Sequence, residues 1–194
     1  HNVQKTLKRY TYLYSDLTLA VYMGICGAVD QSLHVADTVI PEALASYAHP
    51  ADPPVTNVPF PEQMMRSFCG ISLHCGGIML TANSLVPAAE KKIIAQQKPT
   101  VSCVDMEAYY AALIMKEYHV PLTVIKTVSD GAHTLLPDES FIIQIMGART
   151  YFLRLKLALR HPWNALKYGI FRWYIKQAIS HNTRWVQHIV ELYT

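Results

Sequence analysis

The stretch VDMEAYYAALIMKEYHVPLTVIKTVSDGAH, which runs from Val104 to His133, decides the fold that the sequence predicts. It indicates a turn, an amphipathic helix over residues 106–118, a proline stop at Val120-Pro121 and an apolar strand over residues 122–128. A short strand is predicted directly before it, at residues 101–104. Strand, helix and strand with short links form a βαβ unit, so we expect a right-handed crossover between parallel strands.

Acidic side chains stand at the ends of these predicted elements. Asp105 and Glu107 begin the helix, and Asp130 follows the strand. Ligands of open α/β sheets bind where strand carboxyl ends meet helix amino ends, so Glu107 and Asp130 are expected to flank one pocket. The helix dipole favours an ionised Glu107, whereas burial behind an apolar strand favours a protonated Asp130. Such a pair suits general acid chemistry on a glycosidic bond. Helix capping by Asp105 and a turn at Asp130-Gly131 are the alternative explanations.

Length and composition indicate one globular domain. The chain has 194 residues, of which 51% are hydrophobic and 16% charged, and this is enough apolar material for a sizeable core. Two runs without charged residues, Leu17–Val29 and Ser67–Ala89, are predicted to be buried strands with their turns. The first is shorter than the about 20 residues that cross a bilayer, and the second contains several glycines and polar residues. The proline-rich segment 49–61 is predicted to be a surface loop, either a lid over a site or an inert connector.

The four cysteines, Cys26, Cys69, Cys75 and Cys103, show no paired CxxC spacing and lie in largely apolar surroundings. They are predicted to be reduced and buried in a cytoplasmic protein. A metal cluster of His74-Cys75 with Cys69 is the weaker alternative, because this spacing fits no standard zinc site. We therefore expect no metal.

Charge is divided unevenly along the chain. Residues 1–139 hold 9 basic and 13 acidic side chains, a net charge of −4, whereas residues 140–194 hold 8 basic and 1 acidic, a net charge of +7. Helices are predicted at 141–159 and 163–193. Such a basic part can meet nucleic acid, a membrane surface or an acidic partner. The favoured prediction is a helical cap on the sheet, with solvated cations and with Trp and Leu facing the core; membrane contact is the weaker alternative, and nucleic acid is not expected.

The opening stretch resembles the core of the nucleoside phosphorylase/nucleosidase superfamily. The family pattern of an acidic-Met-Glu motif, Val-Pro and Ser-Asp stands here as Asp105-Met106-Glu107, Val120-Pro121 and Ser129-Asp130. Two further segments agree with it in the same order along the chain: Gly24–Val29 followed by His34–Asp37, and Gly77–Thr81 followed by Asn83–Val86. The resemblance covers about Val3 to His133. It is greatest to the methylthioadenosine/S-adenosylhomocysteine nucleosidases and the futalosine hydrolases.

This resemblance implies a fold and a domain plan. The fold would be α/β, with three α/β/α layers, a mixed central sheet and C-terminal helices. Residues 1–194 would form a single nucleosidase-like domain that lacks the family's N-terminal strands, and residues 140–194 would be its basic helical C-terminal part. In the family, a carboxylate near the first strand activates the attacking water. No residue of this sequence is expected to fill that role, so either N-terminal residues are missing or the protein has rebuilt its base.

The resemblance also implies roles for individual residues. Asp130 would protonate the purine at N7, and Glu107 would hold the ribose 2′- and 3′-hydroxyls and stabilise an oxocarbenium-like transition state. The remaining implied site residues contact the sugar, orient the acid or line the base pocket: Met106 on the sugar, Ser129 on Asp130, and Leu85 and Val86 on the base.

Two more residues belong to the predicted site. Gly27, in the glycine-rich segment, either forms a tight turn or lets the backbone approach a ligand closely. Lys126 stands where the family often has Arg and could approach the attacking water or the sugar; a solvent-exposed lysine at a strand end is the alternative.

Departures from the family pattern narrow the expected reaction. Hexameric bacterial phosphorylases bind phosphate with an Arg and a Ser, and the equivalent positions here are Tyr22 and Ile25. A phosphate dianion would be poorly paired there, so water is the expected acceptor. Leu85 replaces an aromatic residue that usually stacks on adenine, which leaves room for futalosine-type nucleosides.

The sequence therefore predicts hydrolysis of the N-glycosidic bond of a 5′-substituted purine nucleoside, of the methylthioadenosine/adenosylhomocysteine or futalosine/aminofutalosine type. A cytoplasmic homodimer without a cofactor is expected, with menaquinone biosynthesis as the process if futalosine is the substrate. The alternatives are a purine nucleoside phosphorylase, or a non-catalytic nucleoside-binding or membrane-associated module.

Overall fold

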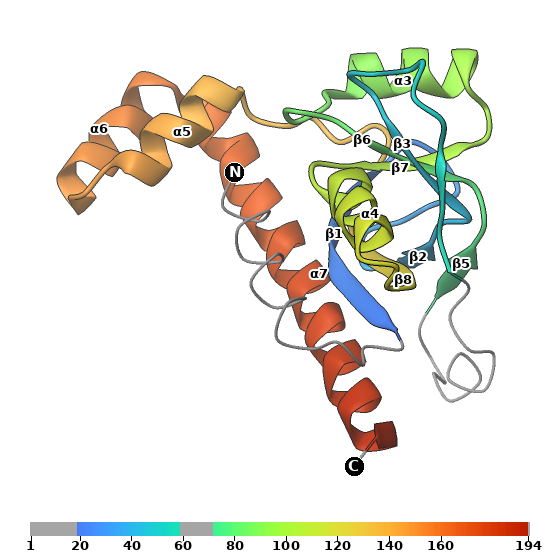
Figure 1. Cartoon of the computed structure of the whole chain (residues 1–194). Coiled ribbons are helices and arrows are strands. Elements are labelled where there is room, and N and C mark those ends of the chain that lie inside the picture. The colour runs from blue at the N-terminus through green and yellow to red at the C-terminus, as the bar shows by residue number, and fades with distance from the viewer. Residues whose placement is uncertain (1–18, 59–71, 194) are drawn as a thin grey trace.

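The computed structural model describes residues 19–58 and 72–193, and a mixed eight-stranded sheet forms the centre of this part of the chain (Figure 1). Side by side, the strands lie in the order β4-β3-β6-β7-β1-β8-β2-β5. The longest, β1 and β8, pair along their length in the interior of the sheet. The bounds in chain order are β1 (Ala20–Ala28), β2 (Thr38–Ile40), β3 (Ala43–Ser46), β4 (Val55–Thr56), β5 (Leu73–Cys75), β6 (Ile78–Thr81), β7 (Val101–Asp105) and β8 (Leu122–Asp130).

Helices cover both faces of this sheet, so the domain has three layers. Val124 and Ile125 are neighbours on β8 and point to opposite faces, because side chains alternate along a strand. Val124 belongs to the core shared with α4, whereas Ile125 packs against Trp185 of α7. The predicted three-layer α/β/α fold with a mixed sheet is confirmed. The helices are α3 (Ala88–Gln97), α4 (Ala108–Glu117), α5 (Glu139–Gly147), α6 (Tyr151–Arg160) and α7 (Pro162–Tyr193).

The strands β7 and β8 do not form the expected βαβ unit. They lie on either side of β1, with β7 antiparallel and β8 parallel to it. The parallel neighbour of β7 is β6, and α3 connects these two strands. The prediction was right about the elements and wrong about their pairing. A continuous apolar run indicates a buried strand but does not indicate which strands lie beside it.

The glycine-rich segment is part of β1 rather than a turn after it. The strand continues to Ala28, with a register shift between Cys26 and Gly27. A Cβ on Gly24 would lie 2.9 Å from Nζ of Lys126, and one on Gly27 would lie 2.7 Å from Oδ2 of Asp130. The two glycines therefore make room for charged side chains that cross the strand, and the expected tight turn is wrong.

Several other segments differ from the prediction in extent. Residues 72–81 form two strands, β5 and β6, because Gly76 and Gly77 adopt φ angles of 116° and 73° and redirect the chain. The helix predicted at 141–159 is interrupted between α5 and α6. The described part of the proline-rich segment, residues 49–58, is not loop throughout, because it contains β4. Its residues Pro50, Asp52 and Pro54 line a hollow beside β6 and the end of α3.

Burial of the cysteines is only partly as expected. Cys26 and Cys103 are buried, whereas Cys75 is exposed at the end of an edge strand. Cys69 lies outside the described residues. So does Val3–Tyr14, where apolar and aromatic positions at helical spacing predict a helix.

Helix α7 packs along the sheet, as the expected helical cap requires. Trp185 is fully buried, and its Nε1 donates a 2.9 Å hydrogen bond to Oγ1 of Thr38. Asn182 donates to the carbonyl of Gly24 at 2.6 Å and accepts from the hydroxyl of Thr127 at 2.6 Å. The prediction that Trp and Leu face the core holds for Trp185. It is wrong for Trp163 and Trp173 of α7, which are 63% and 57% exposed, and for α6, in which no side chain is buried. None of the described helices is both long and apolar enough to cross a membrane.

Candidate active site

A cavity of about 180 Å³ opens where the carboxyl ends of β1, β7 and β8 come together. Every residue predicted for the site except Lys126 lines it. The lining residues are Ile25, Cys26 and Gly27 of β1; Ser84, Leu85 and Val86 before α3; Lys91 of α3; Val104, Asp105, Met106 and Glu107 at the junction of β7 and α4; Ser129 and Asp130 of β8; Leu136; and Phe171 of α7.

The pairing of the strands explains why the two predicted carboxylates meet. The short strand β7 overlaps only the last residues of β1, so Gly27 pairs with Val104 on one side and with Asp130 on the other. Glu107 follows directly after β7 and therefore reaches the same cavity as Asp130. The expected meeting of strand ends is present, although β7 and β8 run in opposite directions relative to β1.

Asp130 is buried at the base of the cavity and is held by its neighbour. The hydroxyl of Ser129 lies 2.7 Å from Oδ1 of Asp130 and 3.1 Å from the carbonyl oxygen of Cys26. A hydroxyl in this position orients one carboxylate oxygen and leaves the other free for a further partner. This geometry fits the orienting role expected for Ser129.

The further partner is Lys91, which the sequence analysis missed. Its side chain is only 1% exposed, and its ammonium group forms an ion pair with Oδ2 of Asp130 and lies 3.3 Å from the carbonyl oxygen of Gly131. A buried charge requires such a partner, because an unpaired ion in the interior is costly. The cavity thus holds a Lys91–Asp130 pair rather than an isolated acid.

The helical period of α3 contained a signal for Lys91. Lys91 stands three residues before Ile94, the other buried side chain of this helix, so the two lie on one face. In the printed sequence Lys91 lies between Glu90 and Lys92 and is easily assigned to a solvated surface. A lysine on the buried stripe of a helix could have been flagged on periodicity alone.

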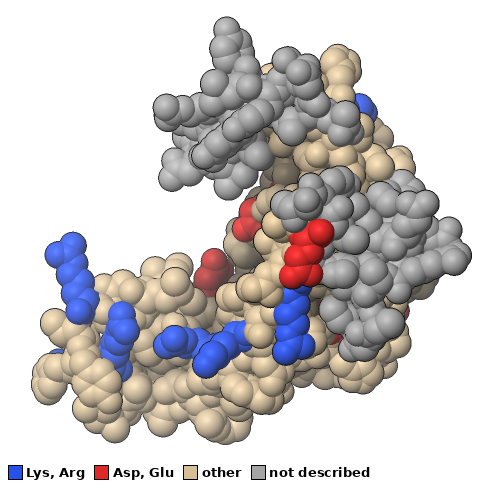
Figure 2. Space-filling model, turned by 90° about the horizontal axis from the view of Figure 1, so that it is seen from below, with Lys and Arg blue, Asp and Glu red and all other residues tan. Residues whose placement is uncertain are grey.

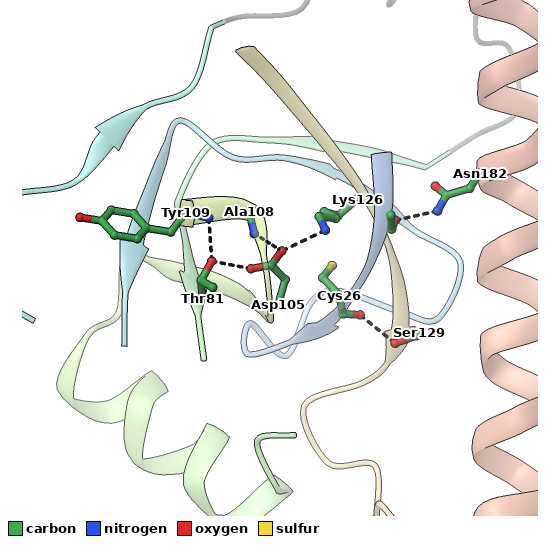
Figure 3. A network of polar contacts seen from close by, with 9 residues as sticks. Cys26, Thr81, Asp105, Ala108, Tyr109, Lys126, Ser129 and Asn182 are labelled. Carbon is green, nitrogen blue, oxygen red and sulfur yellow. Dashed lines mark hydrogen bonds and ion pairs between the residues drawn. The ribbon is translucent and has the colours of Figure 1, made fainter. Parts of the chain in front are cut away.

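Below the cavity, Asp105 organises the start of α4 (Figure 3). Its Oδ2 accepts from the backbone N–H of Ala108 at 2.8 Å, and its Oδ1 accepts from the hydroxyl of Thr81 at 2.6 Å. The same hydroxyl oxygen accepts from the backbone N–H of Tyr109 at 2.9 Å. Capping by Asp105, considered as an alternative from the sequence, is therefore present, and it fixes the segment that carries Glu107.

Lys126 belongs to this supporting network and not to the cavity lining. Its Nζ lies 2.9 Å from Oδ2 of Asp105 and 4.4 Å from the centre of the Tyr22 ring, and Figure 3 shows it pointing toward Asp105. Burial opposes its charge, but the attraction of Asp105, with smaller effects of Tyr22 and Glu107, outweighs burial and raises the pKa of Lys126. The prediction of a solvated strand end is wrong, because the side chain is 1% exposed. Its approach to the attacking water or the sugar stays a prediction.

Glu107 and Met106 are the exposed members of the site. Met106 is 41% exposed, and Glu107 also faces solvent on one side. Glu107 forms no capping hydrogen bond with α4, and loss of solvent on its other side raises its pKa. This direction is opposite to the effect expected from the helix dipole. Lys126 partly offsets it by lowering the pKa of Glu107.

Apolar side chains line the cavity together with the charged groups. Leu85 and Val86, both predicted, stand in the segment before α3, and Leu136 and Phe171 also line the cavity. Phe171 comes from α7, so the basic C-terminal part contributes to the site. Phe171 lies far beyond the family motifs in the sequence, so the sequence did not indicate that it lines the cavity.

Comparison with known proteins places the chain in a family. The family model of the phosphorylase superfamily matches residues 6–151, which is 146 of the 194 residues. The chain belongs to the phosphorylase superfamily. The resemblance inferred from the sequence motifs is thereby confirmed. No curated protein is similar enough in sequence to be matched with the chain.

Solved structures share the fold of this superfamily member at low sequence identity. Futalosine hydrolase of Helicobacter pylori is 13% identical, with a TM-score of 0.63 over 97% of this chain and 73% of its own. The methylthioadenosine/S-adenosylhomocysteine nucleosidase of Neisseria meningitidis, in complex with methylthio-immucillin-A, is 19% identical, with a TM-score of 0.61 over 95% and 74%. The corresponding nucleosidase of Streptococcus pneumoniae, in complex with 8-aminoadenine, is 16% identical, with a TM-score of 0.61 over 96% and 76%.

Tyr22 and Ile25 stand where the sequence resemblance implies the Arg and Ser with which hexameric bacterial phosphorylases bind phosphate. Ile25 lines the cavity with an apolar side chain. Tyr22 lies under Lys126 in the supporting network, and burial raises the pKa of its hydroxyl. Among the described lining residues, the cation is Lys91, which is already paired with Asp130.

Proposed function

We propose that this protein hydrolyses the N-glycosidic bond of a 5′-substituted purine nucleoside and releases the free base. The observation that carries the proposal is one cavity that Asp130 and Glu107 line together with the apolar Leu85 and Val86. A carboxylate for the ribose, a proton source for the base and an apolar slot for its ring are the groups that this reaction needs. The relation to nucleosidase structures supports the same reaction.

On the ribose side, Glu107 is the proposed catalytic carboxylate. Its position at the open side of the cavity suits hydrogen bonds from the 2′- and 3′-hydroxyls, with Met106 packed against the sugar. As the bond from C1′ to the base breaks, positive charge develops on the ribose ring. A carboxylate beside that charge stabilises the transition state more than the ground state, which is what accelerates the reaction.

On the base side, the Lys91–Asp130 pair is the proposed proton source. The electrons of the breaking bond move into the purine, and protonation at N7 makes the base a neutral leaving group. With Lys91 on Oδ2 and Ser129 on Oδ1, the Asp130 carboxyl is held by two donors, and a proton shared with Lys91 can pass to the base. Water then adds its hydroxyl to C1′, and its remaining proton restores the pair.

Water is the proposed acceptor because the described part of the cavity offers phosphate no unpaired cation. Ile25 replaces a hydroxyl donor, and Lys91 is engaged by Asp130. A phosphorylase remains the second candidate function, since the superfamily bears that name.

The substrate class, assembly and location stay predictions. The apolar Leu85 in place of a stacking aromatic ring favours a futalosine-type over a methylthioadenosine-type nucleoside. A homodimer and a cytoplasmic location are expected as before.

Product analysis tests the reaction and the substrate together. The protein is incubated with methylthioadenosine, adenosylhomocysteine, futalosine and aminofutalosine, with and without phosphate, and the products are identified by mass spectrometry. Free base and a ribose product at equal rates in both buffers would support hydrolysis. Ribose 1-phosphate formed only with phosphate would establish a phosphorylase instead, and no base release from any nucleoside would overturn the proposal.

A further inference from the structure

Helix α6 presents an apolar surface to solvent, which is unusual for a helix of a globular domain. None of its side chains is buried, and Tyr151, Phe152 and Leu159 are 82%, 76% and 74% exposed. Contiguous exposed apolar surface on a folded protein marks a site of contact with another body. Figure 1 shows α5 and α6 extending from the N-terminal end of α7, away from the sheet.

The pattern of α6 is that of a helix that lies at an interface. With 3.6 residues per turn, Tyr151, Phe152, Leu155 and Leu159 fall within an arc of about 100°. Three cations border this arc: Lys156 and Arg160 follow it on one side, and Arg154 lies on the other. We call these seven residues the basic apolar face of α6.

The surroundings of this face are basic as well. Residues 140–194 carry 8 basic side chains and 1 acidic one, and α6 itself contains no acidic residue. Figure 2 shows Lys and Arg side chains gathered on the underside of the molecule, on the side where Figure 1 places α5 and α6. An occupant of the face must therefore combine negative charge with an apolar interior.

We propose that the basic apolar face of α6 docks on an anionic lipid surface, with the helix in the plane of the interface. Leu155, Leu159 and Phe152 would insert below the headgroups, and Arg154, Lys156 and Arg160 would pair with lipid phosphates. Amphipathic helices with a cationic border bind membranes in this way. The protein would be held at the surface of the membrane through this helix.

Charge complementarity favours lipid over the other occupants. A second copy of this chain docked through the same face would bring two clusters of cations together, because a two-fold interface places the same patch on both partners. Nucleic acid would satisfy the cations but leave Phe152 and Leu159 against a hydrophilic backbone. A bilayer with anionic headgroups satisfies both parts of the face.

Trp163 supports the orientation of the helix. It stands just after α6, at the start of α7, and is 63% exposed, while Tyr151 stands at the opposite end of α6. Tyr and Trp favour the level of the headgroups, because their rings have an apolar body and a polar atom. Aromatic residues at both ends would hold α6 parallel to the bilayer surface.

Vesicle co-sedimentation of the full chain tests the proposal. Vesicles of phosphatidylcholine alone are compared with vesicles in which part of it is replaced by phosphatidylserine, at low and at high salt. Binding to the anionic vesicles that weakens with salt is expected. The triple variant Arg154→Gln/Lys156→Gln/Arg160→Gln should lower the partition coefficient about a hundredfold at low salt. Phe152→Ser/Leu159→Ser should weaken binding at least about tenfold.

Matched controls remove the same number of cations or apolar groups elsewhere. Lys92→Gln/Lys98→Gln/Lys116→Gln removes three exposed cations, from α3, from the residue that ends it and from α4. Ile93→Ser/Leu113→Ser removes two exposed apolar side chains from α3 and α4. Both control variants should bind anionic vesicles like the unmodified protein. Circular dichroism melting checks that each variant is folded.

Each outcome supports or contradicts docking of this face on an anionic lipid surface. Failure of the unmodified protein to sediment with anionic vesicles at low salt would overturn the proposal, and so would equal losses in the test and control variants. Sedimentation velocity tests whether a second copy of this chain occupies the face instead. A dimer that Phe152→Ser/Leu159→Ser dissociates, without vesicle binding, would assign the face to a second copy.

Discussion

At the scale of single residues, the Lys91–Asp130 pair changes what a mutation of the acid should do. From the sequence, Asp130→Asn is expected to stop base release and leave the fold intact. The ion pair adds a cost: without the carboxylate, the buried ammonium of Lys91 has lost its charged partner. We expect base release to fall about 10²–10⁴-fold and the free energy of unfolding to fall by about 3–5 kcal/mol.

A second substitution separates these two effects. Asp130→Asn/Lys91→Met removes both charges, so it should recover most of the lost stability while remaining inactive. Urea denaturation and base release are measured on the single and double variants. Unchanged stability of Asp130→Asn would show that the pair is not formed in solution, and near-normal turnover would contradict the role of Asp130.

The role of Lys91 in proton transfer can be tested through the leaving group. Lys91→Met should slow release of a purine about 10²–10⁴-fold. Hydrolysis of 4-nitrophenyl riboside should change far less, because nitrophenolate leaves without a proton. Lys91→Arg keeps the charge and should retain intermediate activity. If Lys91→Met slows both substrates equally, Lys91 is structural or binds the sugar, and the shared-proton mechanism is wrong.

Glu107 illustrates a conflict between activity and stability at one residue. Because burial raises its pKa, the folded state binds more protons than the unfolded state as pH rises past the ordinary value of about 4.5. Stability is therefore lost as pH rises through the folded pKa, and the loss persists at neutral pH. At pH values above the folded pKa of Glu107, Glu107→Gln should thus be slightly more stable than the parent, by less than about 1 kcal/mol given the exposure of this residue. Below the unfolded pKa of Glu107, the two proteins should be equally stable.

Activity of the same variant should move in the opposite direction. Without the negative charge beside the ribose, kcat is expected to fall about 10²–10³-fold. Denaturation at several pH values and single-turnover base release measure the two effects. A variant that is less stable than the parent at neutral pH would contradict the sign derived from burial.

At the scale of elements, α7 is held to the sheet by its distal half and contributes to the cavity by its proximal half. Trp185 and Asn182 make the contacts with β1, β2 and β8, whereas Phe171 lines the cavity. Trp185→Ala should lower the free energy of unfolding by about 3–5 kcal/mol, because it leaves a large hole between helix and sheet. Trp163→Ala is the matched control: its side chain is 63% exposed, and a change within about 0.5 kcal/mol is expected. Equal losses in the two variants would show that α7 is not docked as described.

At the scale of the whole molecule, the sequence predicted local features better than pairings between them. The helix predicted at 106–118 and the strand from 122 follow from local apolar patterns and the stop at Val120-Pro121. The neighbours of β7, the burial of Lys91 and the contribution of Phe171 depend on contacts between residues far apart in the chain, which local patterns do not encode. Glu107 and Asp130 could nevertheless be placed at one cavity from the ends of their elements. The family resemblance supplied Met106, Ser129, Leu85 and Val86, which line the same cavity.

The arrangement of the whole molecule also predicts that the basic apolar face of α6 can be removed without affecting the cavity. Helix α6 has no buried side chain, and the cavity is lined by residues of the sheet, of α3 and α7, of the segments that precede α3 and α4, and by Leu136. Replacing residues 149–160 by a Gly/Ser linker of equal length should therefore leave thermal melting and purine binding close to those of the parent. Vesicle binding should disappear, since the basic apolar face is gone. Scanning calorimetry, titration with purine and co-sedimentation measure the three properties on one sample. A large loss of melting temperature would show that α6 stabilises the domain, and retained vesicle binding would move the membrane contact to another part of the chain.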